Sequence, residues 1–64
     1  MKTTEWTLMH VEFRLARALA NACEWVRSAD AYESASRMAE ALGATEAACQ
    51  GRIMQRIMEA NARG

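Results

Sequence analysis

The absence of proline is the feature of this 64-residue chain that most constrains its fold. Proline breaks the interior of a helix, and glycine, which also weakens helices, occurs only at positions 43, 51 and 64. Residues that favour helix, above all Ala, Met, Glu, Arg and Leu, dominate the sequence. The alternation of apolar and polar residues that is typical of strands does not occur. The sequence therefore predicts an all-α fold.

Apolar residues at helical spacing predict three helices, over about 5–27, 31–42 and 46–62, in a long, short, long order. Asp30 followed by Glu33 resembles a capping box, which would begin the second helix after the segment SADAYE. Gly43 suits the left-handed position that ends a helix, and Thr45 suits the cap of the next. We expect residues 1–64 to form one domain, a small three-helix bundle.

The predicted first and third helices each carry a broad apolar face. The first face comprises Leu8, Val11, Leu15, Leu19, Ala22 and Val26, widened by Met9, Ala16, Ala20 and Cys23. The third comprises Cys49, Ile53, Ile57 and Ala60, widened by Met54 and Met58. The first arc is wider than one neighbouring helix can cover, and a domain of this size buries little of its surface. We therefore expect oligomerisation to complete the bundle, as a homodimer with antiparallel helix packing.

Composition excludes several classes of protein. The formal net charge is zero, which argues against a protein whose main task is to neutralise nucleic-acid phosphates. No segment approaches the apolar length of a membrane span, and the start MKTTEWTLMHVEF does not resemble a signal peptide. We therefore expect a cytoplasmic protein that does not associate with a membrane. The two cysteines lack metal-type spacing, and His10 is the only histidine. We expect no enzyme activity, no metal and no cofactor.

Four residues form a stripe along one side of the predicted first helix: Trp6, His10, Phe13 and Arg17, at spacings of four, three and four. Trp, other aromatic residues and Arg are frequent energetic anchors of protein interfaces. The stripe lies outside the Leu8–Leu15–Leu19 seam, so packing of that seam does not account for it. Two hypotheses remain open: the stripe is a protein-binding surface, or the wide apolar arc continues and other helices cover Trp6 and Phe13.

The segment RMAEALGATEAACQGRI, residues 37–53, reads as a helix, a tight turn at Gly43 and a second helix. Ala39, Leu42 and Cys49 stand where bacterial helix-turn-helix motifs place a small residue, the apolar residue before the turn glycine and an aliphatic residue, so the segment resembles that motif. The resemblance implies a DNA-binding transcriptional regulator whose DNA contacts are Thr45, Gln50, Arg52 and Arg56.

The chemistry of this segment fits DNA less well. Only Gln50 is a good reader of base edges, and Glu46 brings the wrong sign of charge to phosphates. Arg52 and Arg56 come late in the helix, whereas the motif reads bases with its N-terminal residues. We therefore favour a plain corner between two helices and keep DNA binding as the alternative.

Residues 39–54, AEALGATEAACQGRIM, also resemble a local stretch in some small phage-encoded anti-CRISPR proteins. That group shares no active-site motif, so the resemblance carries over no functional residue. Together with the small size and neutral charge, it implies an inhibitor of a bacterial protein machine. The sequence thus predicts a small, non-enzymatic protein-binding regulator, with a host protein complex as partner if a phage encodes it.

Overall fold

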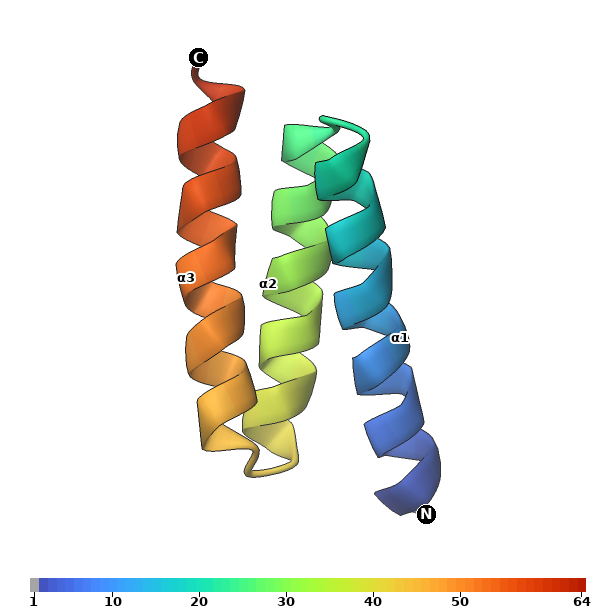
Figure 1. Ribbon diagram of the computed structural model, residues 1–64. Helices are drawn as coiled ribbons and strands as arrows, with labels where there is room; N and C mark the ends of the chain where they lie inside the picture. The colour runs from blue at the N-terminus through green and yellow to red at the C-terminus, as the bar shows by residue number, and fades with distance from the viewer. Residues whose placement is uncertain (1) are drawn as a thin grey trace.

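The computed structural model describes residues 2–64, apart from the side chains of residues 2 and 3, and within this range it contains three α-helices (Figure 1). They are α1 (Lys2–Asn21), α2 (Trp25–Ala41) and α3 (Thr45–Ala62). The prediction of an all-α fold with three helices is confirmed. The helices have 20, 17 and 18 residues, so they are nearly equal and not long, short and long.

The three helices run up, down and up in an open layer with α2 in the middle (Figure 1). Both α1 and α3 pack along α2, whereas α1 and α3 barely meet each other. The molecule measures 40 × 18 × 12 Å along its principal axes. Because only α2 has a neighbour on two sides, each outer helix keeps more than half of its circumference uncovered by the other two.

The turn between α1 and α2 lies at residues 22–24, several residues before the predicted break. Cys23 adopts a left-handed conformation with φ of 60°. The backbone N–H of Glu24 donates to the carbonyl of Leu19 at 2.9 Å, and that of Cys23 donates to Ala20 at 3.0 Å. This is the Schellman pattern of hydrogen bonds, for which glycine is the usual residue. The predicted helix over 5–27 was therefore wrong at its end, since nothing in Ala-Cys-Glu marks a left-handed turn.

The second turn confirms the role expected of Gly43, which has φ of 75°. Here the N–H of Ala44 donates to the carbonyl of Ala39 at 2.8 Å, and the N–H of Gly43 donates to Glu40 at 3.1 Å. The same Schellman pattern thus ends α1 and α2. Two predicted caps were wrong: no side-chain hydrogen bond caps α3 at Thr45, and the Asp30–Glu33 pair lies inside α2.

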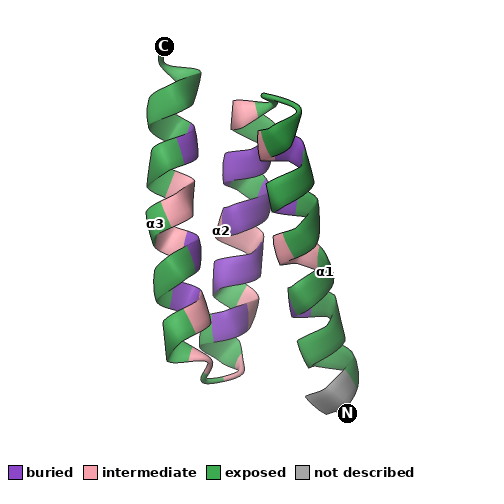
Figure 2. Ribbon diagram, in the orientation of Figure 1, coloured by how far each residue is buried: buried purple, intermediate pink, exposed green. Residues whose placement is uncertain are grey.

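Small residues line the faces of α2 that meet its neighbours (Figure 2). Ala35, Ala39, Ser28 and Ser36 are each fully buried. The Ser28 hydroxyl donates to the carbonyl of Ala16 in α1 at 2.8 Å, and the Ser36 hydroxyl donates to the carbonyl of Tyr32 one turn earlier at 2.7 Å. Both buried hydroxyls are thus hydrogen-bonded, as stability requires. Short side chains let the helix backbones approach closely without a large apolar core.

The predicted apolar face of α1 is confirmed at Met9, Ala16 and Leu19 and is wrong at its other aliphatic positions. Met9, Ala16 and Leu19 are buried against α2, whereas Leu8 and Leu15 are about half exposed. Val11 and Val26 are likewise exposed, and Ala22 and Cys23 belong to the turn and not to the helix. The close approach to α2 buries the side of the predicted arc that carries Ala16 and leaves the side with Leu8 and Leu15 exposed.

The predicted apolar face of α3 is confirmed at Met58 and Met54 and is wrong at the two isoleucines. Ala48, Gly51 and Met58 are buried, whereas Ile53 is 51% exposed and Ile57 45% exposed. Gly51 packs where no side chain fits: a Cβ atom there would overlap the Ser36 hydroxyl and lie 3.0 Å from the Phe13 ring. Gly51 is therefore a point of close contact between α3 and its neighbours, and α3 carries two apolar faces, one inward and one outward.

Candidate functional site

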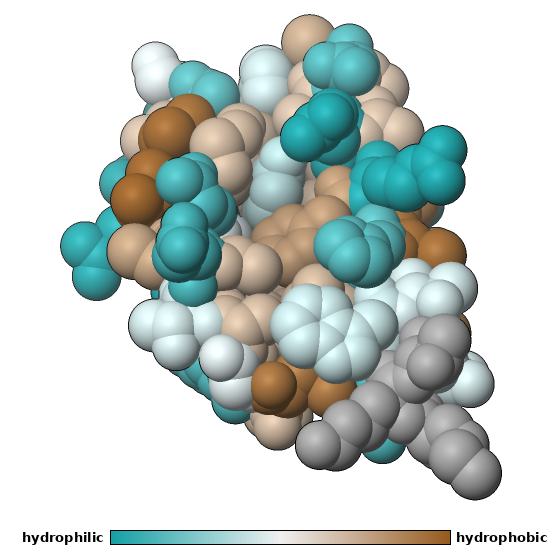
Figure 3. Space-filling model, turned by 60° about the horizontal axis from the view of Figure 1, so that its bottom comes forward, coloured by the Kyte–Doolittle hydropathy of each residue, from teal (hydrophilic) through white to brown (hydrophobic). Residues whose placement is uncertain are grey.

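A groove of about 530 Å³ runs between α1 and α3, with α2 as its floor. The residues that line it come from all three helices: Met9, His10, Phe13, Arg17, Ala20 and Asn21 of α1, Tyr32 of α2, and Ala47, Gln50, Gly51 and Met54 of α3. The groove exists because α1 and α3 both pack on α2 but barely touch each other. Figure 3 shows apolar side chains in the middle of one face of the molecule, with hydrophilic side chains to either side.

The aromatic stripe of the sequence forms or adjoins the α1 wall of this groove. His10, Phe13 and Arg17 line it, and Trp6 stands one turn before His10 with its ring centroid 6.4 Å from the imidazole. Trp6 is 37% exposed, and His10 and Arg17 are exposed as well. These three side chains are therefore accessible to a partner in the free chain.

Phe13 differs from the other three members of the stripe because it is half-buried. It packs against both clusters of buried residues that form the core, and its ring centroid lies 6.3 Å from that of Tyr32. Its edge also rests on Gly51 of α3. Phe13 therefore belongs to the core and to the groove at once, as the wedge that bridges α1 and α3.

The groove has one charged residue, Arg17, and among the described residues no Asp or Glu lines it. No ion pair or hydrogen bond engages the Arg17 guanidinium within residues 4–64. Three other arginines do form exposed ion pairs: Arg27 with Glu24 of the first turn, Arg37 with Glu33 within α2, and Arg52 of α3 with Glu40 of α2. The groove thus offers an unneutralised cation beside apolar surface.

The four residues proposed for DNA contact do not share one surface. Gln50 lines the groove, whereas Thr45 and Arg52 line a different hollow beside Glu40. The Arg52 guanidinium pairs with the Glu40 carboxylate at 3.1 Å, and Arg56 is exposed. One of the two arginines that this hypothesis assigns to DNA, Arg52, is therefore already ion-paired with a carboxylate.

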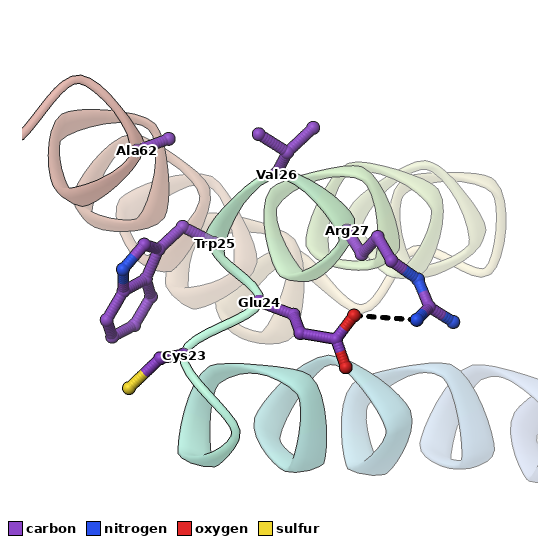
Figure 4. A pocket seen from close by; sticks show the side chains of 6 residues that line it. All are labelled: Cys23, Glu24, Trp25, Val26, Arg27 and Ala62. Carbon is purple, nitrogen blue, oxygen red and sulfur yellow. Dashed lines mark hydrogen bonds and ion pairs between the residues drawn. The ribbon is translucent and has the colours of Figure 1, made fainter.

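A smaller hollow lies at the other end of the layer, where the α1–α2 turn approaches the end of α3 (Figure 4). The Trp25 indole and Ala62 line it on one side, and the free thiol of Cys23 is exposed at the turn. The Arg27 guanidinium donates to the Glu24 carboxylate at 2.7 Å across its rim, as the dashed line in Figure 4 marks. Its only charges are thus already paired, unlike Arg17 in the groove.

Residues 2–64 contain no group of three or more His, Cys, Asp or Glu side chains placed to hold a metal ion. No described helix combines the length and apolarity needed to cross a membrane.

Sequence reasoning found the α1 wall of the groove but missed its other members. Tyr32 forms the floor, and Ala47, Gly51 and Met54 form the α3 wall. The one available signal was Gly51, a glycine within a strongly helical segment, which marks the point where α3 meets Phe13. Known proteins add nothing to this assignment, because no family model, curated protein or solved structure matches the chain.

Proposed function

We propose that this protein is a small, non-enzymatic regulator that binds another protein in the groove between α1 and α3. The observation that carries the proposal is the groove itself, in which an aromatic floor meets accessible His10 and Arg17, with Trp6 exposed beside His10. Trp and Arg are over-represented among residues that dominate binding free energy. Apolar surface with a few convergent polar groups is also the usual make-up of a binding site.

The geometry favours a protein partner over the alternative, a DNA-binding helix-turn-helix regulator. The two helices of a DNA-reading motif cross at about 90–120°. Here α2 and α3 run side by side in opposite directions along their lengths (Figure 1). A net charge of zero and the pairing of Arg52 with Glu40 further weaken an attraction to phosphates. Titration of a random duplex at physiological salt is expected to give no binding tighter than about 10⁻⁶ M.

We propose, as the more specific form of this function, an inhibitor of a bacterial protein machine such as those that phages encode. Its support is the small neutral chain and the local resemblance of residues 39–54 to anti-CRISPR proteins. Expression of the protein in bacteria with active CRISPR immunity is expected to restore plaque formation by a targeted phage. Unchanged immunity across the common CRISPR types would contradict this specific form and leave the binding function intact.

Capture from bacterial lysate tests the binding function with matched variants. The full chain is compared with Trp6→Ala and Arg17→Ala, which alter exposed residues at the groove, and with Val26→Ala and Arg37→Ala, which alter exposed residues elsewhere. We expect the groove variants to lose a partner protein that the control variants retain, since a true anchor contributes about 2 kcal/mol or more. Identical captured proteins for all five chains would contradict binding in the groove.

A further inference from the structure

We infer that the occupant of the groove is an amphipathic helix of the partner protein that brings a carboxylate to Arg17. This inference rests on the proposed function and adds the shape and charge of the partner element. Three observations carry it: the groove left between α1 and α3, the small and flexible side chains that line it, and the unpaired cation at its edge.

The shape of the groove matches a helix. Four-helix bundles place two helices on either side of a shared core. A partner helix laid between α1 and α3 would complete such an arrangement with the three helices of residues 2–64, and it would cover the exposed part of Phe13 above Tyr32. The α1 wall extends from Met9 to Asn21, about 18 Å at the rise of an α-helix, which corresponds to roughly three turns of the incoming helix.

The side chains of the groove permit the close approach that helix packing requires. Ala20 and Ala47 are half-buried and project little from their helices, so a second backbone can come near them. Met54 is half-buried, unbranched and flexible, which lets it adapt to the side chains of another helix. An extended strand, by contrast, would need unpaired backbone N–H and C=O groups, which α-helices do not offer.

The charge of the groove selects an acidic partner. Arg17 is exposed, lacks an ion pair within residues 4–64 and has no lining carboxylate beside it. The other polar residues at the edge, His10, Asn21 and Gln50, carry no negative charge. A Glu or Asp on the flank of the incoming helix would form a charge-assisted hydrogen bond with the guanidinium, whereas a Lys there would be repelled.

A second copy of this chain fits the groove less well. Its exposed apolar residues on α1 are Leu8, Val11 and Leu15. Leu8 and Leu15 are each two residues from a groove residue, His10 and Arg17, so they lie on nearly the opposite side of the helix. Docking that strip into the groove of another copy would leave a free strip and a free groove at the two ends. Such head-to-tail contacts propagate without closing, whereas soluble oligomers are mostly closed.

A displayed library of helical peptides tests the inference on the full-length protein. The peptides are roughly 18 residues long, enough to fold as helices when bound, with apolar residues on one face and Glu, Lys or Gln at the flanking positions. We expect selection to enrich Glu at a flanking position. The recovered peptide is expected to bind Arg17→Glu at least about tenfold more weakly than the native chain. The matched control Arg56→Glu makes the same charge change on exposed α3 surface outside the groove, and should bind normally.

Two further arms make each outcome decisive. In the first arm, a peptide in which Lys replaces the enriched Glu should regain binding to the Arg17→Glu protein. In the second, the protein variant Gln50→Trp, a bulky change at the exposed edge of the groove, should abolish binding of every peptide. Peptides that Gln50→Trp blocks but that show no preference for Glu over Lys overturn the acidic helix and leave the proposed function standing. Failure to recover any peptide or lysate protein that Gln50→Trp blocks overturns both. A dimer that Arg17→Glu converts to single chains assigns the groove to a second copy and overturns the inference.

Discussion

Cys23 ends α1 in a left-handed conformation that most side chains avoid. The penalty for a residue with a Cβ atom in this region is about 1 kcal/mol, and glycine escapes it. The Cys23 side chain is exposed, so its removal costs little packing. We therefore expect Cys23→Gly to raise the free energy of unfolding by about 1 kcal/mol, measured by urea denaturation followed by circular dichroism.

Gly43 supplies the matched control for this prediction, because it holds the same position at the end of α2 with φ of 75° and open space around its Cα atom. Gly43→Ala should lower the free energy of unfolding by about 1 kcal/mol. A loss of stability in Cys23→Gly would contradict the argument and show that the thiol makes a stabilising contact at the turn.

Gly51 is the point where α3 lies closest to its neighbours. Substitution by Ala would gain up to about 1 kcal/mol of helix propensity, but the new methyl group would meet the Ser36 hydroxyl and the edge of Phe13. Overpacking typically costs about 1–3 kcal/mol, so we expect Gly51→Ala to be destabilising on balance in thermal melts. Adding Ser36→Ala removes the nearest atom, and the double variant should recover part of the loss. Equal effects with and without Ser36→Ala would show that this contact is not the cause.

At the scale of the element, the aromatic stripe of α1 divides into two kinds of residue. Phe13 packs against both core clusters and against Tyr32, whereas Trp6 is exposed beside His10. Phe13→Ala should therefore cost about 2–4 kcal/mol of stability, a large fraction for a domain this small. Trp6→Ala should cost less than about 1 kcal/mol, as is usual for surface positions. Thermal melts by circular dichroism distinguish the two, and equal losses would place Trp6 in the core as well.

The helices and their faces show how far sequence reasoning reaches. Composition and periodicity predicted three helices. The turn at Gly43 was predictable because glycine is the usual residue in the left-handed conformation that ends a helix. The turn at Cys23 carried no such signal, since its hydrogen bonds come entirely from the backbone. The α1 wall of the groove was predictable because interface residue types recur at helical spacing on one helix. Its floor at Tyr32 depends on which face of α2 lies between the outer helices, which no local pattern encodes.

The predictions of the buried faces of α1 and α3 were partly wrong for one shared reason. Each predicted face was centred on its aliphatic residues, among them Leu8, Leu15, Ile53 and Ile57, which are about half exposed. The inward contacts use alanine, serine and glycine beside a few larger residues such as Met9 and Met58, because α2 packs at short range against α1 and α3. Small residues have little apolar area, so a search for hydrophobic periodicity passes over a seam of this kind.

At the scale of the whole molecule, the large apolar residues left exposed on both outer helices bear on self-association. Leu8, Val11 and Leu15 form a strip on α1, and Ile53 and Ile57 form another on α3. Burial of such side chains stabilises association by roughly 25 cal/mol per Å². We expect a dimer through the α1 strip, with twice the 7.1 kDa mass of one chain in light scattering at micromolar concentration.

The double variant Leu8→Gln/Leu15→Gln should return this mass to that of one chain without loss of helicity, because both residues are exposed in the single chain. The matched variant Ile53→Gln/Ile57→Gln alters the other helix and should leave the dimer unchanged. A native chain that elutes with a single-chain mass at all micromolar concentrations would contradict the dimer.

Because α2 lies in the centre, the molecule consists of two helical hairpins, α1–α2 and α2–α3, that share α2. Either outer helix can swing away while the other hairpin persists, because α1 and α3 barely meet. Opening α2, however, disrupts both hairpins at once. Amide hydrogens of α2 should thus exchange with solvent only through global unfolding, whereas those of α1 and α3 exchange through separate local openings. A partner helix laid across the groove would join the two outer helices and convert these separate openings into one cooperative event.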